Sequence, residues 1–150
     1  MKNTEIPKVL GIDGKEKMSK SLNNQIELAL SADETRKRVM MMVTDPQRIK
    51  RTDPGNPDVC NVFSLYKIFT PKEDVEIINV ECRRAGIGCV DCKKLFAANL
   101  NIALEPLRAR RLELASKPDQ IQAVLADGAS RARAIAEKTM KEVRAAVQLP

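Results

Sequence analysis

The sequence predicts a mainly α-helical protein. It contains three Phe, one Tyr and no Trp, and alternating runs of β-branched residues are scarce, so a sheet-rich fold is not expected. Ala, Leu, Arg, Glu and Lys, most of which favour helix, dominate the second half of the chain. Capping residues and prolines recur at intervals that suit separate helices. Together these features predict a succession of helices joined by turns.

The first 30 residues predict an extended segment and a loop. Pro7, Gly11 and Gly14 interrupt any helical period, and residues 9–12 are typical of the end of a strand. No partner strands are predicted for it, so we expect the sequence to continue from a larger protein. Residues 17–21, Lys-Met-Ser-Lys-Ser, form a polar loop. Its lysines and N–H groups suit phosphate oxygens, although a merely solvated loop would carry the same residue types.

A first helix is predicted from a capping box at Ser31 and Glu34 to about Val43. The apolar residues on its inward face are Val39, Met42 and Val43. Residues 44–57 hold three prolines and a glycine and should form a turning connector. Three of its side chains are basic: Arg48, Lys50 and Arg51. They suit either a solvated face or an RNA backbone.

Two shorter helices should follow the connector. Asp58 is predicted to cap the first, with Cys60 in its first turn, and a second capping box is predicted at residues 70–73. The apolar residues at helical spacing in the first are Val59, Val62, Phe63 and Tyr66. One stripe of the second carries Val75, Ile78 and Cys82. Cys82 should therefore end that helix.

The remainder of the chain predicts three more helices. One runs from about Val90 to Leu114 with a kink at Pro106, and the next begins at Pro118 and ends near Gly128. The last is predicted over residues 129–147. Its inward residues are expected to be Ile135, Met140 and Val143.

The four cysteines are the densest chemical feature of the sequence. Cys82, Cys89 and Cys92 read C-x6-C-x2-C, and Cys60 stands alone before them. Gly86 and Gly88 are expected to turn the chain between Cys82 and Cys89 through positive φ angles. Thiolates select zinc or an iron–sulfur cluster, and a remote fourth ligand suits a cluster better than paired zinc knuckles. By spacing alone, a 4Fe–4S cluster, zinc, and disulfides or idle thiols all stay open.

Composition limits the function further. The net charge of +6 and pI near 9.3 favour a polyanionic partner such as RNA, although a merely basic domain would show the same values. The chain has no histidine, which excludes catalysis by Ser-His or Cys-His pairs and metal binding through imidazole. No run of about 18 apolar residues predicts a membrane span.

Three stretches of the sequence resemble one family. Residues 17–21 resemble the second signature, KMSKS, of class I aminoacyl-tRNA synthetases. Together with the connector segments 44–46 and 51–55, they resemble bacterial tryptophanyl-tRNA synthetases over essentially the whole chain. A subset of that family holds a 4Fe–4S cluster with a remote cysteine followed by C-x6-C-x2-C. The resemblance therefore implies such a cluster on Cys60, Cys82, Cys89 and Cys92.

The resemblance also implies a domain plan and a reaction. The family joins tryptophan to its tRNA through tryptophanyl-adenylate, on a Rossmann domain followed by a helical anticodon-binding domain. Residues 1–30 would be the end of the catalytic domain, and residues 31–150 the anticodon-binding domain with the cluster. Lys17 and Lys20 would stabilise charge on the departing pyrophosphate of ATP, a Mg-dependent step. The ATP-binding loop as a whole comprises Lys17, Met18, Ser19, Lys20 and Ser21.

The implied partners are tRNA(Trp), tryptophan and ATP in a cytoplasmic, homodimeric parent enzyme. Basic residues interleave with the cysteines: Arg83, Arg84, Lys93 and Lys94. They would either meet the anticodon or neutralise the cluster. The first class I signature, of the H-x-G-H type, needs histidine, so we expect a C-terminal piece of the enzyme that is inactive alone. The alternatives are an iron–sulfur electron carrier or redox sensor, and a zinc-stapled helical RNA-binding module.

Overall fold

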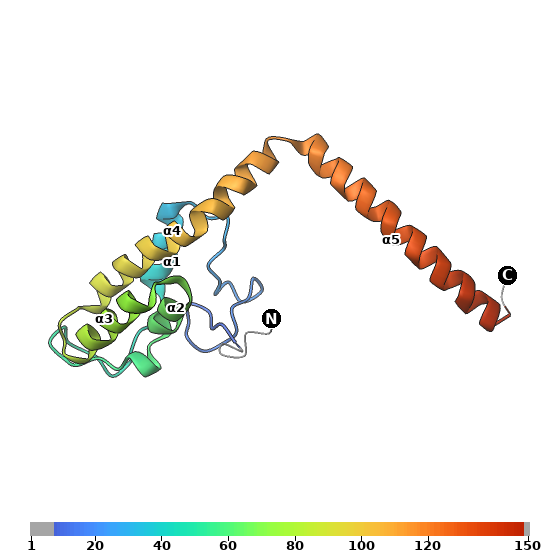
Figure 1. Ribbon diagram of the computed structural model, residues 1–150. Helices are drawn as coiled ribbons and strands as arrows, with labels where there is room; N and C mark the ends of the chain where they lie inside the picture. Colours follow the sequence, from blue (N-terminus) through green and yellow to red (C-terminus); the bar gives the residue numbers. More distant parts are fainter. Residues whose placement is uncertain (1–7, 149–150) are drawn as a thin grey trace. The chain divides into compact units, whose positions relative to one another are not determined.

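The structure is a computed structural model that describes residues 8–148 (Figure 1). Over that range the chain is mainly helical, and the only β contact is an isolated antiparallel bridge between Leu10 and Lys17. The elements are α1 (Ala32–Met41), the 3-10 helix η1 (Pro57–Val59), α2 (Asn61–Phe69), α3 (Lys72–Arg83), α4 (Cys89–Ala115) and α5 (Pro118–Ala146). The predicted mainly α fold is confirmed. Within residues 8–148, no helix combines the length and apolarity that a bilayer crossing requires.

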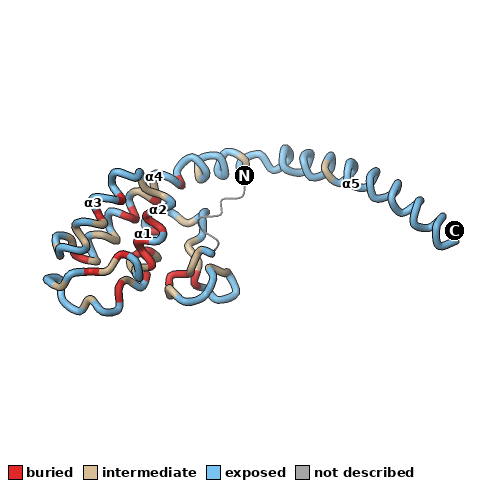
Figure 2. The backbone as a smooth tube through the Cα atoms, turned by 60° about the horizontal axis from the view of Figure 1, so that its bottom comes forward, coloured by how far each residue is buried: buried red, intermediate tan, exposed pale blue. Residues whose placement is uncertain are grey.

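Two compact units share the chain, one ending at Arg108 and the other beginning at Ala109. The first contains a hydrophobic core formed where α1, α2, α3 and the first half of α4 pack together (Figure 2). Tyr66 and Phe96 lie at its centre with ring centroids 5.1 Å apart, and the Tyr66 hydroxyl donates to the Cys92 carbonyl at 2.9 Å. The core residues with almost no exposure are Val39, Met42, Val62, Tyr66 and Phe96.

Helix α1 begins as predicted. The Ser31 hydroxyl accepts from the Glu34 N–H at 3.3 Å, and the Glu34 carboxylate accepts from the Ser31 N–H at 3.0 Å, which completes the capping box. Val39 and Met42 are buried as expected, but Val43 is exposed. The placement of Val43 was wrong because Met42 leaves the helical conformation, at ψ 141°, and the helical spacing no longer applies.

The starts of the next two helices differ from the prediction. Asn56, not Asp58, is the cap: its side chain accepts from the Asp58 N–H at the start of η1. Cys60 then occupies the N-cap of α2 without a side-chain capping bond. The capping box at residues 70–73 does not form, because Pro71 holds the N-cap position of α3 and leaves Thr70 one residue too early. Thr70 instead caps the C-terminus of α2.

The two long helices give one confirmation and one correction. Helix α4 spans nearly the predicted residues and contains Pro106. Helix α5 runs continuously through Gly128, so the predicted break there was wrong, because one glycine in an Ala-rich helix costs only about 1 kcal/mol. No residue of α5 is buried, and the side chains expected to point inward are exposed: Ile135, Met140 and Val143 (Figure 2).

Candidate cysteine centre and lysine loop

The four cysteines lie at the ends of three helices of the first unit. Cys60 precedes α2, Cys82 lies in the last turn of α3, and Cys89 and Cys92 form the first turn of α4. The predicted positions of the last three are confirmed, and Cys60 lies one residue before its helix. All four thiols are free and half-buried.

The thiols lie close enough to influence one another's ionisation. Burial is the main cause that raises the pKa values of Cys60, Cys82 and Cys92, the last to about 12. Repulsion between neighbouring thiolates raises these pKa values further, and every pair among the four cysteines adds to this repulsion. Since one thiolate disfavours the next, the four sulfurs can all ionise only beside a compensating positive charge.

Arg48 supplies part of that charge. Its guanidinium lies 4.0 Å from the Cys82 Sγ and 3.8 Å from the Cys89 Sγ, and it opposes the effect of burial on the pKa of Cys82. It also donates to the carbonyls of Arg51 and Ile87, both at 2.8 Å. The sequence marked Arg48 only as one basic residue of the connector, and no local signal distinguished it from its neighbours.

Gly55 makes room for one of the thiols. Its N–H donates to the Cys82 carbonyl at 2.9 Å, and a Cβ on Gly55 would lie 2.5 Å from the Cys82 Sγ. Any larger residue would therefore displace this sulfur. The connector is thus built against the cysteine centre through both Arg48 and Gly55.

The turn between Cys82 and Cys89 differs from the prediction in its backbone. Ala85, at φ 59°, adopts the left-handed conformation, whereas neither Gly86 nor Gly88 has a positive φ. A Cβ on Gly86 would displace the flexible end of the Glu81 side chain, and one on Gly88 would make an ordinary van der Waals contact with Arg51. The prediction was wrong because Ala85 takes the left-handed conformation of this turn, so the turn does not need a positive φ at either glycine.

The grouping of the four thiols bears on which metal group they could hold. Among residues 8–148, no three Cys, Asp or Glu side chains are grouped so that they could hold one metal ion. Four thiolates around one zinc stand about 3.8 Å apart, because each lies about 2.3 Å from the metal. The ligands of a 4Fe–4S cluster stand farther apart, because each binds a different iron. Free thiols at three helix ends, with a guanidinium beside two of them, are the donors that either group would use.

The predicted phosphate-binding loop is held to the first unit by backbone contacts. The Met18 N–H donates to the Val9 carbonyl, and the Gly11 N–H donates to the Glu16 carbonyl, both at 2.9 Å. Gly14 closes the turn at φ 66°, where a side chain would be strained. The predicted strand end is thus reduced to one isolated bridge, and the Val43 N–H donates to the Ile12 carbonyl at 2.9 Å, which ties the segment to the end of α1.

Buried Asn24 organises this loop from within. Its Oδ1 accepts from the Ser19 N–H at 2.8 Å, and its Nδ2 donates to the Asp13 carboxylate at 2.8 Å. Asp13 also accepts from the Lys15 and Glu16 N–H groups, and the first of these bonds is the main cause that lowers the Asp13 pKa. Sequence reasoning missed Asn24 and Asp13, because no pattern indicated which polar residue of the segment is buried.

The lysines of the loop are available for an anion. Lys17 and Lys20 are exposed, and neither side chain has a hydrogen bond or ion pair with any residue between 8 and 148. The Ser19 and Ser21 hydroxyls lie 2.8 Å apart. Met18 lines an apolar cavity of about 150 Å³ together with residues of α2 and α4. The loop is therefore anchored by Met18 while its cations stay free.

The basic residues near the cysteines are all engaged inside the protein. Arg83 donates to Asp58 at 2.7 Å, and Arg84 pairs with Glu81. The other two have one partner each: Lys93 donates to the Met40 carbonyl at 3.0 Å, and Lys94 to the Asp91 carboxylate at 3.3 Å. These contacts do not block RNA, but they reduce the charge that each side chain can offer it.

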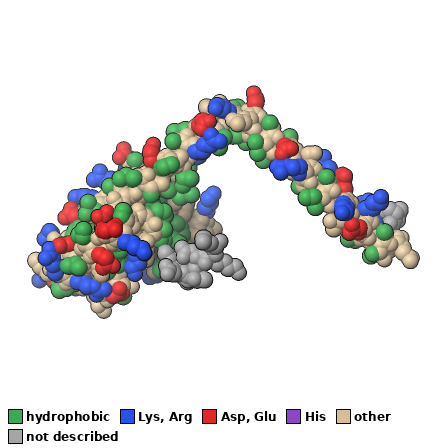
Figure 3. Space-filling model, in the orientation of Figure 1, with side chains coloured by type: hydrophobic (Ala, Val, Ile, Leu, Met, Phe, Trp, Pro, Cys, Tyr) green, Lys and Arg blue, Asp and Glu red, His purple; other side chains and the backbone are tan. Residues whose placement is uncertain are grey.

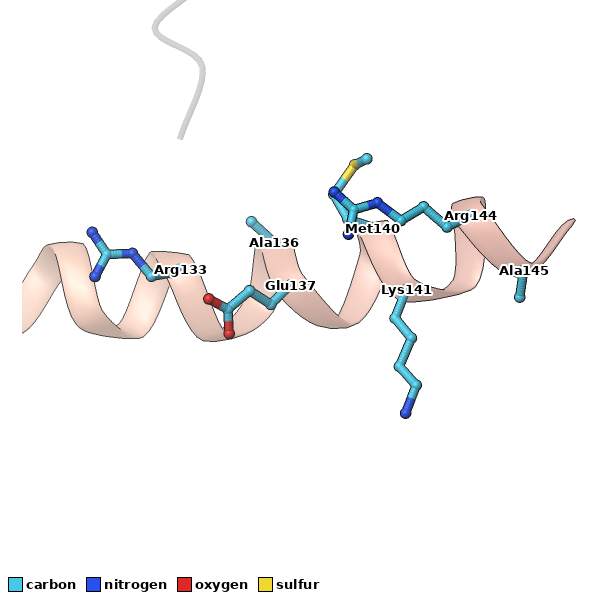
Figure 4. A pocket seen from close by; sticks show the side chains of 7 residues that line it. All are labelled: Arg133, Ala136, Glu137, Met140, Lys141, Arg144 and Ala145. Atoms are coloured by element: carbon cyan, nitrogen blue, oxygen red, sulfur yellow. The ribbon is translucent and has the colours of Figure 1, made fainter. Parts of the chain in front are cut away.

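A hollow of about 590 Å³ lies on α5 (Figure 4). It is formed by Arg133, Ala136, Glu137, Met140, Lys141, Arg144 and Ala145. All of these side chains belong to one exposed helix, so nothing encloses a ligand there. The chemistry of the chain lies in the first unit.

Comparison with known proteins identifies the family. The sequence model of the class I tRNA synthetases for W and Y matches residues 4–105. The chain belongs to this family. It is 46% identical over 148 residues to the tryptophan–tRNA ligase of Aquifex aeolicus, covering 98% of this chain and 37% of that protein. The ligase of Thermotoga maritima is 40% identical over 147 residues, covering 97% and 44%.

Solved structures agree with this assignment. Tryptophanyl-tRNA synthetase from Campylobacter jejuni, complexed with ADP and tryptophan, matches with a TM-score of 0.84 and 29% identity, covering 98% of this chain and 45% of that one. The enzyme from Aeropyrum pernix matches with a TM-score of 0.59 and 30% identity, covering 70% and 30%. The chain spans about two fifths of the length of the curated relatives it matches.

Proposed function

We propose that the chain provides the KMSKS loop and the anticodon-binding region of a tryptophan–tRNA ligase. The observation that carries this proposal is the 46% identity to the Aquifex aeolicus ligase over nearly the whole chain, with the exposed lysines of the loop in place. Residues 1–30 would belong to the catalytic domain and residues 31–150 to the anticodon-binding domain of a cytoplasmic, homodimeric enzyme. The relatives favour neither an electron carrier nor a zinc-stapled module.

In this proposal Lys17 and Lys20 act on ATP. Both ammonium groups would hold phosphate oxygens and stabilise the charge that grows on the departing pyrophosphate while tryptophan attacks the α-phosphate. The anchored Met18 and the buried Asn24 would fix the loop from which they project, which limits the entropy lost when ATP binds. Tryptophan itself would be bound by other parts of the enzyme.

The loop can be tested in a chimera of the Aquifex aeolicus ligase that carries this chain in place of its matching 148 residues. Lys20→Ala should slow adenylate formation in single-turnover assays while tryptophan binding stays within about twofold, because the charge develops only in the transition state. Lys8→Ala removes one charge from the same segment as a control. An unchanged activation rate in Lys20→Ala would contradict the proposed role. The 150-residue chain alone should show no tryptophan-dependent pyrophosphate exchange.

We also propose that Cys60, Cys82, Cys89 and Cys92 bind a 4Fe–4S cluster. The support is the convergence of four free thiols, the guanidinium of Arg48 beside two of them, and the space that Gly55 leaves for Cys82. Such a cluster would join three helix ends, and no step of the reaction passes through it. Arg48 would offset the negative charge of the thiolate shell.

Iron and sulfide analysis of anaerobically purified protein tests the cluster. Cys89→Ser should remove it, and Gly55→Ala should reduce its occupancy although all four thiols remain. Gly128→Ala is the matched control, because a Cβ there meets no atom within 4 Å. Full iron content in Cys89→Ser, or zinc instead of iron in the unaltered chain, would refute the assignment.

A further inference from the structure

A basic pocket lies beside the cysteine centre, between the connector and the first turn of α4. It has a volume of about 280 Å³. Its walls are Thr44, residues 48–51 and residues 88–91. Figure 3 shows Lys and Arg side chains along the lower left edge of the first unit, where Figure 1 draws the connector and the turn that leads into α4. None of the predicted site residues except Cys89 lines this pocket.

The pocket contains two cations that the fold does not use. Lys50 and Arg51 are exposed, and neither side chain hydrogen-bonds or pairs with any residue in the described range 8–148. Arg51 lies beside Gly88, where an added Cβ would be 3.4 Å from the Arg51 Cγ. The acidic residue of the wall, Asp91, is paired with Lys94. The pocket thus offers unpaired positive charge, unlike the turn at Arg83 and Arg84.

Apolar side chains complete the lining. Ile49, which stands between Arg48 and Lys50 in the sequence, is 87% exposed, and Val90 is 54% exposed. The neighbouring N–H groups of the first turn of α4 carry the partial positive charge of a helix start. Two free cations beside two aliphatic surfaces suit a nucleotide, whose phosphate needs charge and whose base needs an apolar face. The pocket volume of about 280 Å³ is slightly below the roughly 300–1,000 Å³ of most small-molecule sites. A pocket of this size suits a single nucleotide.

We propose that this pocket binds one unpaired nucleotide of the tRNA(Trp) anticodon loop. Lys50 and Arg51 hold its phosphate, and the base packs against Ile49 and Val90. This inference rests on the proposed function, because that function supplies the RNA. It places the main RNA contact on the connector rather than on Arg83, Arg84 and residues 93–94, which are already engaged in internal contacts.

The test measures binding of a fluorescent tRNA(Trp) anticodon stem-loop to the 150-residue chain. Lys50→Ala with Arg51→Ala should weaken binding about tenfold or more, and should reduce the slope of log affinity against log salt by about 0.7 for each phosphate that is no longer neutralised. The matched control is Arg36→Ala with Lys37→Ala, two adjacent exposed cations on α1. It should weaken binding by about twofold or less, since it removes only long-range attraction. Equal weakening in both double variants would overturn the proposal.

A second variant tests the base contact without changing charge. Ile49→Ser should weaken binding of the anticodon stem-loop about fivefold at an unchanged salt slope, because the base loses its apolar face while the phosphate keeps both cations. Unchanged affinity in Ile49→Ser would overturn the base contact. If the unaltered chain does not bind the stem-loop, the proposed function fails as well. If it binds but Lys50→Ala with Arg51→Ala binds equally well, only this inference fails.

Discussion

The first unit and helix α5 have similar apolar spacing but opposite burial. In the first unit, Val62 and Phe96 are fully buried, whereas Ile135 on α5 is 70% exposed although it also recurs at helical spacing. Polar contacts differ in the same way. The first unit is held by bonds between distant residues, such as Asn61 to the Gly11 carbonyl at 2.7 Å. Among the described residues, the side-chain contacts of α5 are local, such as Arg131 to Asp127. Apolar periodicity therefore predicts a helix but does not identify what covers it.

The largest loss of stability is expected from a substitution of Phe96 in the first unit. Phe96→Ala removes a fully buried ring from the centre of the first unit and should cost about 3–5 kcal/mol of unfolding free energy. Urea denaturation followed by near-ultraviolet signals of Tyr66 reports on this unit, since the Tyr66 ring lies 5.1 Å from that of Phe96. A decrease below about 1 kcal/mol would mean that α4 does not form this core.

A matched pair of isoleucines makes the comparison sharper. Ile78→Ala in α3, where the side chain is 7% exposed, should destabilise the chain by about 2–5 kcal/mol. The same change at Ile135 of α5 should alter stability by about 0.5 kcal/mol or less. Both are measured by chemical denaturation in the 150-residue chain. A large effect at Ile135 would show that a partner or a second copy covers α5 in solution.

Replacing two glycines with alanine should change the free energy of unfolding in opposite directions. Gly11→Ala places a Cβ 2.2 Å from the Asn24 Nδ2 and should cost about 1–3 kcal/mol by forcing that buried side chain to move. Gly128→Ala meets no atom within 4 Å and should stabilise α5 by about 1 kcal/mol, because alanine favours helix. Thermal unfolding followed by circular dichroism measures both. Lower helicity in Gly128→Ala would support a break in α5 at that position.

The smallest effect should come from exposed carboxylates in the two regions. The hydrogen bond and charge of Arg83 hold the pKa of Asp58 below its ordinary 3.8, and Arg110 and then Lys117 lower that of Glu113. A lowered pKa gives stability that is present above the ordinary value and is lost as pH falls through the folded-state pKa. Midpoints of thermal unfolding between about pH 6 and pH 2 measure this effect. Asp58→Asn should reduce the decrease of the unfolding midpoint of the first unit as pH falls. An unchanged slope of midpoint against pH would contradict the ion pair between Asp58 and Arg83.

The sequence by itself determined the features that depend on neighbours along the chain. The capping box at Ser31 and Glu34 forms because both partners lie within one turn, and the apolar stripe of α3 is buried where its period placed it. The spacing of Cys82, Cys89 and Cys92 likewise placed them at helix ends. The KMSKS segment, together with the connector and the cysteine spacing, indicated the family, which the comparisons confirmed.

Tertiary structure decided the features that depend on distant residues. Only the folded chain brings Arg48 beside the sulfurs of Cys82 and Cys89, 34 and 41 positions away, and only it buries Asn24 beneath the lysine loop. It also left the apolar face of α5 uncovered, which no local pattern indicates. Local hydrogen bonds and helical periods act over a few residues and can be read along the chain. Burial depends on surfaces that meet in space, and a single sequence does not state which surfaces those are.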